Sequence, residues 1–184
     1  MAKRRTLDLI VLLLISVFVI TVSAQVYYSL GMTSTITTAT TDVYFVLGVD
    51  NGTAGVSLSP QNTYATLTGL KAYPNASFTY TDPLRVRNNN ATSAYSIRLG
   101  PVSLSGNDTE FVYVKFLLRN GTSEDNATLA SLNYTCNGSQ WTIPSTTDWV
   151  SIPGTTEYAI TVVTKAKDDA GSAQVQIEIA VDVE

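Results

Sequence analysis

The fold class of this 184-residue chain is decided by the stretch Val175-Gln176-Ile177-Glu178-Ile179-Ala180-Val181-Asp182-Val183. Its odd-numbered residues are all aliphatic, whereas its even-numbered residues are mostly polar. Because successive side chains of a β-strand point to opposite faces, this period of two predicts a strand with one buried face and one exposed face.

The same pattern recurs upstream, where further strands are predicted at residues 78–86, 94–99, 111–118 and 158–162. Turn sequences occur at Asp50-Asn51-Gly52, residues 88–90, Asn120-Gly121 and residues 168–171. The segment 111–118 carries Val112, Val114, Phe116 and Leu118 on one face and Phe111, Tyr113 and Lys115 on the other, which predicts a central strand covered on both sides. No segment after residue 24 shows the 3.6-residue period of a helix. We therefore predict an all-β fold, a β-sandwich of the jelly-roll or immunoglobulin-like type.

The chain has no His and a single Cys, Cys136, and these counts exclude several enzyme classes. Without His it cannot form a Ser-His-Asp triad or a zinc site of the H-E-x-x-H kind, and one Cys cannot supply a thiolate cluster. No Gly-rich phosphate loop leads from a strand into a helix, and the net charge of −4 argues against a nucleic-acid partner. We therefore expect no enzymatic activity, no cofactor and no metal ion.

Three other features each have two interpretations. Acidic residues cluster at 108–110, 124–125 and 168–169 beside predicted turns, where we expect solvated carboxylates and a calcium site is the alternative. Trp141 and Trp149 are expected to pack in the core or between strands, with stacking on a sugar as the alternative. Cys136 is expected to be a buried, unreactive thiol, with an intersubunit disulfide as the alternative.

The first 24 residues have the pattern of a secretory signal peptide. Basic residues 3–5 precede an apolar run at 9–22, and the small residues of Val22-Ser23-Ala24 predict cleavage between Ala24 and Gln25. The run is short for a membrane span, which needs about 20 apolar residues. Two alternatives remain open, an uncleaved N-terminal anchor and a prepilin leader that is cut before the apolar run. We expect a secreted protein.

The surface chemistry indicated by the sequence is hydroxyl and amide rather than charge. The chain contains 26 Thr, 17 Ser and 11 Asn, whereas charged residues make up only 14%. Eight Asn residues begin an N-x-[ST] sequon, where the Ser and Thr content predicts about two or three by chance. Together with the leader this predicts N-linked glycans, although the same tripeptides are also good turn sequences. The sequons begin at Asn51, Asn75, Asn90, Asn107, Asn120, Asn126, Asn133 and Asn137.

A long alternating strand is predicted directly after the leader. Its apolar positions are Val26, Tyr28, Leu30, Met32 and Ile36, and a Thr-rich linker at 37–41 follows. The strand either pairs within its own sandwich or completes a sheet of a neighbouring subunit, because a free apolar edge strand is normally avoided. Burial of five apolar side chains contributes about 10 kcal/mol gross. A head-to-tail contact that does not close generates a filament.

Two segments carry a resemblance to a known family. Leu67-Thr68-Gly69-Leu70-Lys71-Ala72-Tyr73-Pro74, followed by Phe78-Thr79-Tyr80-Thr81-Asp82-Pro83-Leu84-Arg85-Val86-Arg87-Asn88-Asn89, resembles the L-x-x-L-x-P-G-D … F-x-F-x-N-x-G segment of the TasA/camelysin family. The stretch from Gly171 to Ile179 resembles the family's final G-x-S-x-x-L-x-F strand. In size and low charge the chain is most similar to the archaeal bundling pilins. Tyr73-Pro74-Asn75 departs from the family's Pro-Gly-Asp turn, and the protease activity described for some members is not carried over because His is absent.

The resemblance implies a jelly-roll-like β-sandwich with an N-terminal donor strand. It divides the chain into a signal peptide at 1–24, a donor strand and linker at 25–41, and a sandwich domain at 42–184. It implies the major subunit of an extracellular, pilus-like filament, a head-to-tail homopolymer that bundles with neighbouring filaments in adhesion and biofilm formation. The alternative is a monomeric or membrane-anchored, glycosylated surface domain, such as an adhesin or envelope component.

Overall fold

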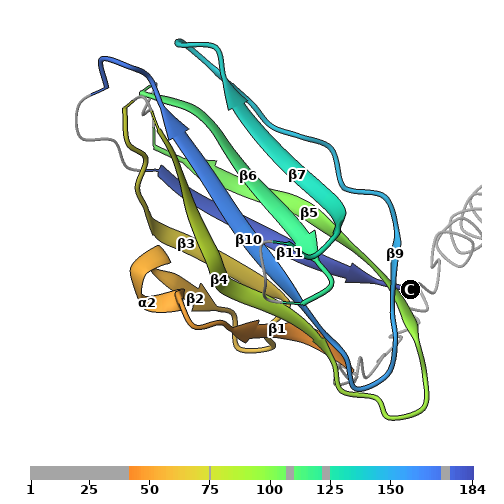
Figure 1. Cartoon of the computed structure of the whole chain (residues 1–184). Helices are drawn as coiled ribbons and strands as arrows, with labels where there is room; N and C mark the ends of the chain where they lie inside the picture. The colour runs from red at the N-terminus through yellow and green to blue at the C-terminus, as the bar shows by residue number, and fades with distance from the viewer. Residues whose placement is uncertain (1–41, 75, 107–109, 122–124, 171–174) are drawn as a thin grey trace, which may run out of the picture. The chain divides into compact units, whose positions relative to one another are not determined.

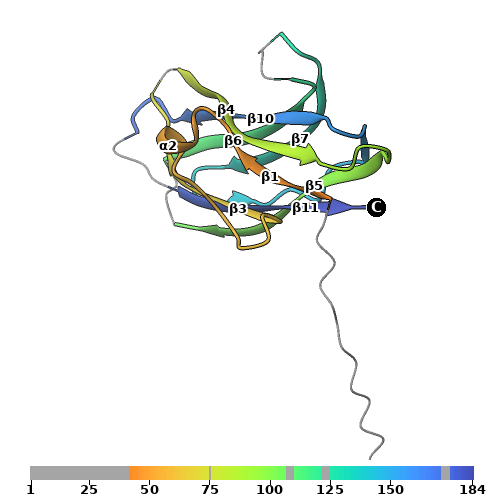
Figure 2. The ribbon, with the colours of Figure 1, turned by 90° about the horizontal axis from the view of Figure 1, so that it is seen from below.

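The computed structural model describes residues 42–74, 76–106, 110–121, 125–170 and 175–184. Within them the chain forms two antiparallel sheets and one short helix, α2 (Asn51–Ala54), so the predicted all-β sandwich is confirmed (Figure 1). Turned by 90°, the two sheets are seen as two layers (Figure 2). No helix in the described residues is long and apolar enough to cross a bilayer.

The six-stranded sheet has the order β1 (Val43–Leu47), β4 (Ser77–Asn88), β10 (Glu157–Ala166), β6 (Phe111–Arg119), β7 (Thr128–Cys136) and β8 (Trp141–Thr142). The five-stranded sheet has the order β2 (Val56–Leu58), β3 (Tyr64–Leu70), β11 (Val175–Val183), β5 (Tyr95–Ser105) and β9 (Val150–Ile152).

Strands that are distant in sequence pair in a nested pattern. β3 pairs with β11, β4 with β10, β5 with β9 and β6 with β7. Pairing of β11 with β5 and of β10 with β6 then joins these ribbons into the two sheets. The chain therefore passes repeatedly from one sheet to the other, and each sheet contains strands from both halves of the domain.

The final strand has the face that its sequence predicts. Val175, Ile177 and Ile179 are almost completely buried, and Val181 is 6% exposed. β11 lies between β3 and β5, so both of its edges are paired as well. The apolar row of this strand forms the middle of the core because it faces the opposite sheet.

β6 differs from its prediction in one respect. The register shifts at its start, where Tyr113 pairs with Lys165 and Phe111 pairs with Ala166. This β-bulge turns Phe111 into the core, where it is 0% exposed, and leaves Val112 only half-buried. The opposite face of the strand is half-buried, so β6 has one fully buried face and the prediction of two was wrong.

The two tryptophans occupy different environments. Trp141 is half-buried and packs against Phe111, with 5.9 Å between the ring centroids. Trp149 is 42% exposed, and the guanidinium of Arg98 lies 4.5 Å from its ring centroid. Trp149 therefore lies outside the core, against a residue of the neighbouring strand β5, so of the two predicted environments core packing was wrong and packing between strands fits.

The predicted tight turn at Asp50-Asn51-Gly52 is instead the start of α2. The helix ends at Gly55, which has φ 63° and takes the left-handed conformation that favours glycine. A Cβ on Gly55 would lie 2.6 Å from the backbone nitrogen of Gly69, so the contact with β3 also requires glycine.

Candidate functional site

Several residues singled out by the sequence lie outside the described residues. They are the donor-strand positions Val26, Tyr28, Leu30, Met32 and Ile36, the cleavage junction Ala24 and Gln25, and the sequon residues Asn75 and Asn107. The Asn residues of the other six sequons are described. They differ in exposure and in whether the side-chain amide is already hydrogen-bonded.

Two sequons have an Asn whose Nδ2 already donates a hydrogen bond, at the turn of Asn90 and at the start of α2. Asn90 accepts hydrogen bonds at its Oδ1 from the backbone nitrogens of Thr92 and Ser93, at 2.9 and 3.0 Å. Its Nδ2 donates to Asp42 at 2.8 Å and to the hydroxyl of Tyr95 at 3.4 Å. Asn51 is half-buried, and its Nδ2 donates to the carbonyl of Gly48 at 2.5 Å. A glycan replaces one Nδ2 hydrogen, so the turn interpretation fits Asn90 best.

Three other sequons present an exposed Asn, and we call Asn120, Asn133 and Asn137 the exposed sequons. Asn133 lies in β7 between the buried residues Leu132 and Tyr134, so its side chain faces outward from the sandwich. Asn137 uses only its Oδ1, which accepts from the backbone of Ser139 and Gln140. Asn126 is half-buried, and its Nδ2 would lie 2.6 Å from a Cβ on Gly121. The exposed sequons are therefore the most accessible of those described.

The start of the sandwich is fixed by Asp42. Its carboxylate accepts from the Tyr95 hydroxyl at 2.7 Å and from Asn90, and its carbonyl accepts from the backbone nitrogen of Asn89 at 2.8 Å. The hydrogen bond from Tyr95 is the main cause that lowers the pKa of the Asp42 carboxyl, and Asn90 adds to it. The same bond raises the pKa of Tyr95. These contacts anchor the residue at which the predicted linker joins the domain.

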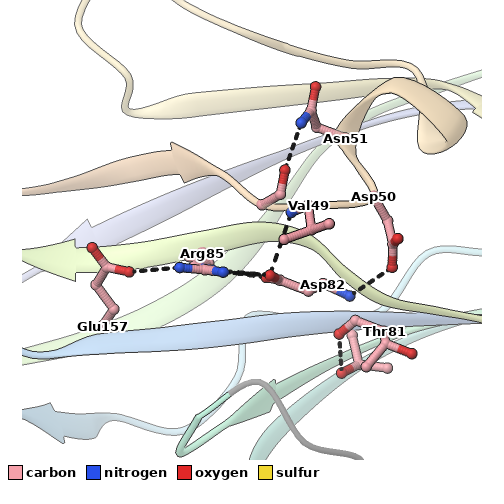
Figure 3. Close-up of polar contacts among 9 residues, drawn as sticks. Val49, Asp50, Asn51, Thr81, Asp82, Arg85 and Glu157 are labelled. Atoms are coloured by element: carbon pink, nitrogen blue, oxygen red, sulfur yellow. Dashed lines mark hydrogen bonds and ion pairs between the residues drawn. The ribbon is translucent and has the colours of Figure 1, made fainter.

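The most connected ionic cluster joins β4, β10 and the loop before α2 (Figure 3). Arg85 donates to both carboxylate oxygens of Asp82, at 2.5 to 3.1 Å, and to Glu157 at 3.0 Å. Asp82 also accepts from the backbone nitrogen of Val49, and its own nitrogen donates to Asp50. The hydrogen bond to Asp82 is the main cause that raises the pKa of Arg85. Because Asp82 accepts from all of these donors, the cluster ties β4, β10 and the loop before α2 together.

The predicted acidic clusters are only partly described. Asp168 and Asp169 are exposed in the turn after β10, and Asp125 is exposed before β7. No group of three or more possible ligands for a metal ion occurs among the residues that the structure describes. Cys136 is buried at the end of β7, as predicted.

The two sheets have four edges, and three of them are short. β2 and β9 have three residues each and β1 has five. The outer side of β1 is also contacted by the loop before β3, because the backbone nitrogen of Phe45 donates to the carbonyl of Asn62 at 2.7 Å. The edge at β9 is extended by Thr147, whose backbone nitrogen donates to the Leu99 carbonyl.

The fourth edge, β7, is long and mostly unpaired. Among the described strands only β8 pairs with its outer side, and β8 covers only Thr135 and Cys136. We call the outer side of residues 128–134 the β7 edge; it contains no charged residue and no Pro. Three large apolar side chains are exposed near this edge. They are Leu129 in β7, Val102 in β5, which contacts β7, and Ile143 just after β8. Native proteins usually protect such an edge with charge, proline or shortness.

The core face of β7 holds a further unusual group. Tyr134 is 0% exposed, and its hydroxyl has no hydrogen-bond partner in the described part of the chain. Burial raises the pKa of this hydroxyl. β7 was missed as a strand from the sequence, because Leu129 on the other face and the turn-like sequon at Asn133 mask the alternation of Ala130, Leu132, Tyr134 and Cys136 that would have indicated it.

No family model matches this chain, and no curated protein matches it significantly.

Proposed function

We propose that this chain is the major structural subunit of an extracellular, pilus-like filament, polymerised when residues 26–36 of one subunit complete a sheet of the next. The partners are further copies of the chain, with N-linked glycans on its surface and neighbouring filaments in bundles. The role is structural, in adhesion and biofilm formation.

The observation that carries this proposal is that the sandwich has a dense core without the predicted donor strand. Within the described residues the buried apolar side chains run from Val43 to Val181, and most of them are 0% exposed. The five apolar donor positions are therefore not needed to fill the space between the two sheets. A strand of this length and hydrophobicity needs another surface, and β-strand addition provides one.

The strand order supports a jelly roll rather than an immunoglobulin-like sandwich. In a jelly roll an antiparallel ribbon of eight strands is wrapped into two sheets, so the first strand pairs with the last and the pairs are nested. The pairs β3–β11, β4–β10, β5–β9 and β6–β7 follow this nesting, with β1, β2 and β8 as short additions. A jelly roll is also the fold that the family resemblance implies.

The hydrogen bonds of Asp42 fit a subunit that transmits tension along a filament. In a filament joined by donor strands, tension would pass through residues 37–41 into the start of β1. At that point Asp42 is held by Tyr95, Asn90 and Asn89 from two other segments. The exposed sequons and the low charge fit a surface that is repeated along a polymer, because repeated net charge would repel neighbouring subunits.

Negative-stain electron microscopy of the purified mature protein, residues 25–184, tests the proposal. We expect filaments from the intact chain and folded monomers from a variant that lacks residues 26–36. A double substitution on the apolar face, Leu30→Asp with Met32→Asp, should also abolish filaments. The matched control, Ser29→Asp with Thr33→Asp, changes the opposite face and should retain them.

Two results would overturn the proposal in different ways. Filaments that persist after deletion of residues 26–36 would exclude donor-strand assembly. A wild-type protein that remains monomeric would favour the alternative of a glycosylated surface domain.

A further inference from the structure

We propose that the acceptor for residues 26–36 is the β7 edge of a second copy of the chain, and that a subunit cannot fill this edge with its own strand. This inference rests on the proposed function, because it identifies where the donor strand docks. Three observations carry it: the availability of the edge, its match to the donor pattern, and the reach of the linker.

The β7 edge is the longest stretch of unpaired strand backbone in the described domain. Seven residues, at about 3.3 Å each, present roughly 23 Å of backbone for strand addition. The edge strands β2 and β9 have three residues each. Beyond β9, residues 100–105 of β5 also lack a described partner strand on that side, but this stretch is one residue shorter than the β7 edge and contains Pro101, which has no backbone N–H to donate. The edge at β1 offers five residues, and the amide of Phe45 is already bonded to Asn62.

The two faces of β7 match the two faces of the predicted donor strand. From residue 130 onward, where its pairing with β6 is regular, β7 carries Ala130, Leu132 and Tyr134 on the core side and Ser131 and Asn133 on the outer side, whereas the exposed Leu129 lies at a β-bulge. The donor alternates in the same way, with five apolar side chains on one face and Ser, Thr, Gly and one Tyr on the other. Neither segment contains a charged residue. An added strand would therefore continue the apolar row inward and the polar row outward.

The linker is too short for a strand to reach the β7 edge of its own subunit. β1 is separated from β7 by β4, β10 and β6, so a strand added beyond β7 lies five strand spacings from β1, about 24 Å at 4.8 Å each. From Ile36 to Asp42 the chain advances six residues, which span at most about 20–22 Å when fully extended.

The strand register sets where this distance is shortest. The pairs Val46–Arg85, Arg85–Ala159, Ala159–Arg119 and Arg119–Thr128 place Val46 level with Thr128, so the start of β1 lies three residues beyond this end of the β7 edge. The shortest path therefore ends at Thr128, and every other point on the β7 edge is farther from Asp42. The linker would also have to pass around the sheet, which lengthens the path.

This geometry makes the contact head-to-tail. Each subunit would offer its donor from the β1 end of the six-stranded sheet and its acceptor from the opposite edge of the same sheet. The two sites do not overlap, so every subunit uses both at once and the contact does not close on itself.

Cysteine cross-linking in the full mature chain tests the acceptor. Ser131→Cys places a thiol on the exposed outer face of β7. It is combined in turn with Ser29→Cys, Thr33→Cys and Thr35→Cys on the polar face of the donor. Directly opposed residues in antiparallel strands have Cα atoms about 4.5–5.5 Å apart, within the range of a disulfide. We expect one donor position to give a ladder of disulfide-linked multimers on a non-reducing gel, at least tenfold above the other two.

The register gives a second, independent readout. Moving the β7 thiol by two residues, from Ser131→Cys to the exposed and regularly paired Asn133→Cys, should lower the number of the best donor position by two, because the strands would be antiparallel. The matched control is Ser57→Cys, an exposed residue of the edge strand β2, which should give no ladder with any donor position.

The outcomes separate this inference from the proposed function. Filaments without a β7 ladder, or with a ladder from Ser57→Cys, would overturn the acceptor and leave donor-strand assembly intact. A cross-linked species that runs as a monomer would show pairing within one subunit and would overturn the reach argument. Wild-type protein without filaments would overturn both proposals.

Discussion

Replacement of Asn88 tests whether one buried amide holds the end of the sandwich where the chain enters. Asn88 is 0% exposed, and its Nδ2 lies 2.8 Å from the carbonyl of Ser93 and 3.1 Å from those of Ile152 and Pro153. Its Oδ1 accepts from the backbone nitrogen of Asn90 at 3.0 Å. One side chain thus ties the end of β4 to the following loop and to the turn after β9.

The magnitude follows from the number of bonds that are lost. Nδ2 has two hydrogens for three acceptors, so Asn88→Ala removes three hydrogen bonds, each worth about 1 kcal/mol net. Carbonyls left without a donor in a buried site cost more, about 1–3 kcal/mol each. We expect a loss of about 3–5 kcal/mol in the free energy of unfolding, a large part of the roughly 5–15 kcal/mol of a typical domain. Asn88→Asp should lose at least as much, because a carboxylate would face the same carbonyl oxygens.

Equilibrium urea unfolding measures this loss, on subunits that lack residues 26–36 so that assembly does not contribute. The control is Asn89→Ala, since Asn89 is exposed and uses only its backbone nitrogen, which donates to Asp42. The control should stay within about 0.5 kcal/mol of the parent. An Asn88→Ala variant that also stays within that limit would refute the reasoning, as would equal losses for the two positions.

Tyr134→Phe should leave the free energy of unfolding unchanged or raise it by up to about 1 kcal/mol, because the buried hydroxyl has no partner among the described residues; a loss above 1 kcal/mol in urea would contradict this. Glycopeptide mass spectrometry of the native protein should find sugar at the exposed sequons such as Asn133 and none at Asn90, and the reverse order would contradict the accessibility argument. Asp42 has a lowered pKa in the folded state, so its contribution is complete above the unfolded pKa of about 3.9 and is lost as pH falls through the lower folded value. Asp42→Asn and Tyr95→Phe should therefore both flatten the decline of Tm between about pH 5 and pH 2, and an unchanged decline would contradict this role.

The strands that the sequence predicted correctly are those in which burial and alternation coincide. In β11 every second residue is aliphatic and each of these except the last is buried, so the period of two is visible without any partner strand. β6 was located but given the wrong face at its first residues, because a bulge depends on the register with β10. β7 was missed because an edge strand needs only one apolar row, and Leu129 on the opposite face and the turn-like sequon at Asn133 obscured that row.

The candidate site shows the same division. The sequence located the sequons, but only the fold distinguishes an Asn bonded within a turn, such as Asn90, from an exposed one, such as Asn133. The buried amide of Asn88 and the ionic cluster of Asp82 and Arg85 carried no sequence signal, because their partners lie in other strands or loops.

By itself the sequence determined the all-β class, the absence of His-based chemistry and the surplus alternating strand, because composition and side-chain period are local properties of the chain. The tertiary structure decided which strands are neighbours, and therefore which edge stays open. β1 and β7 lie at opposite sides of one sheet only because β4, β10 and β6 pair between them. The spacing of these strands puts the open edge beyond the reach of the six-residue linker. For this reason we propose that the donor strand links two subunits.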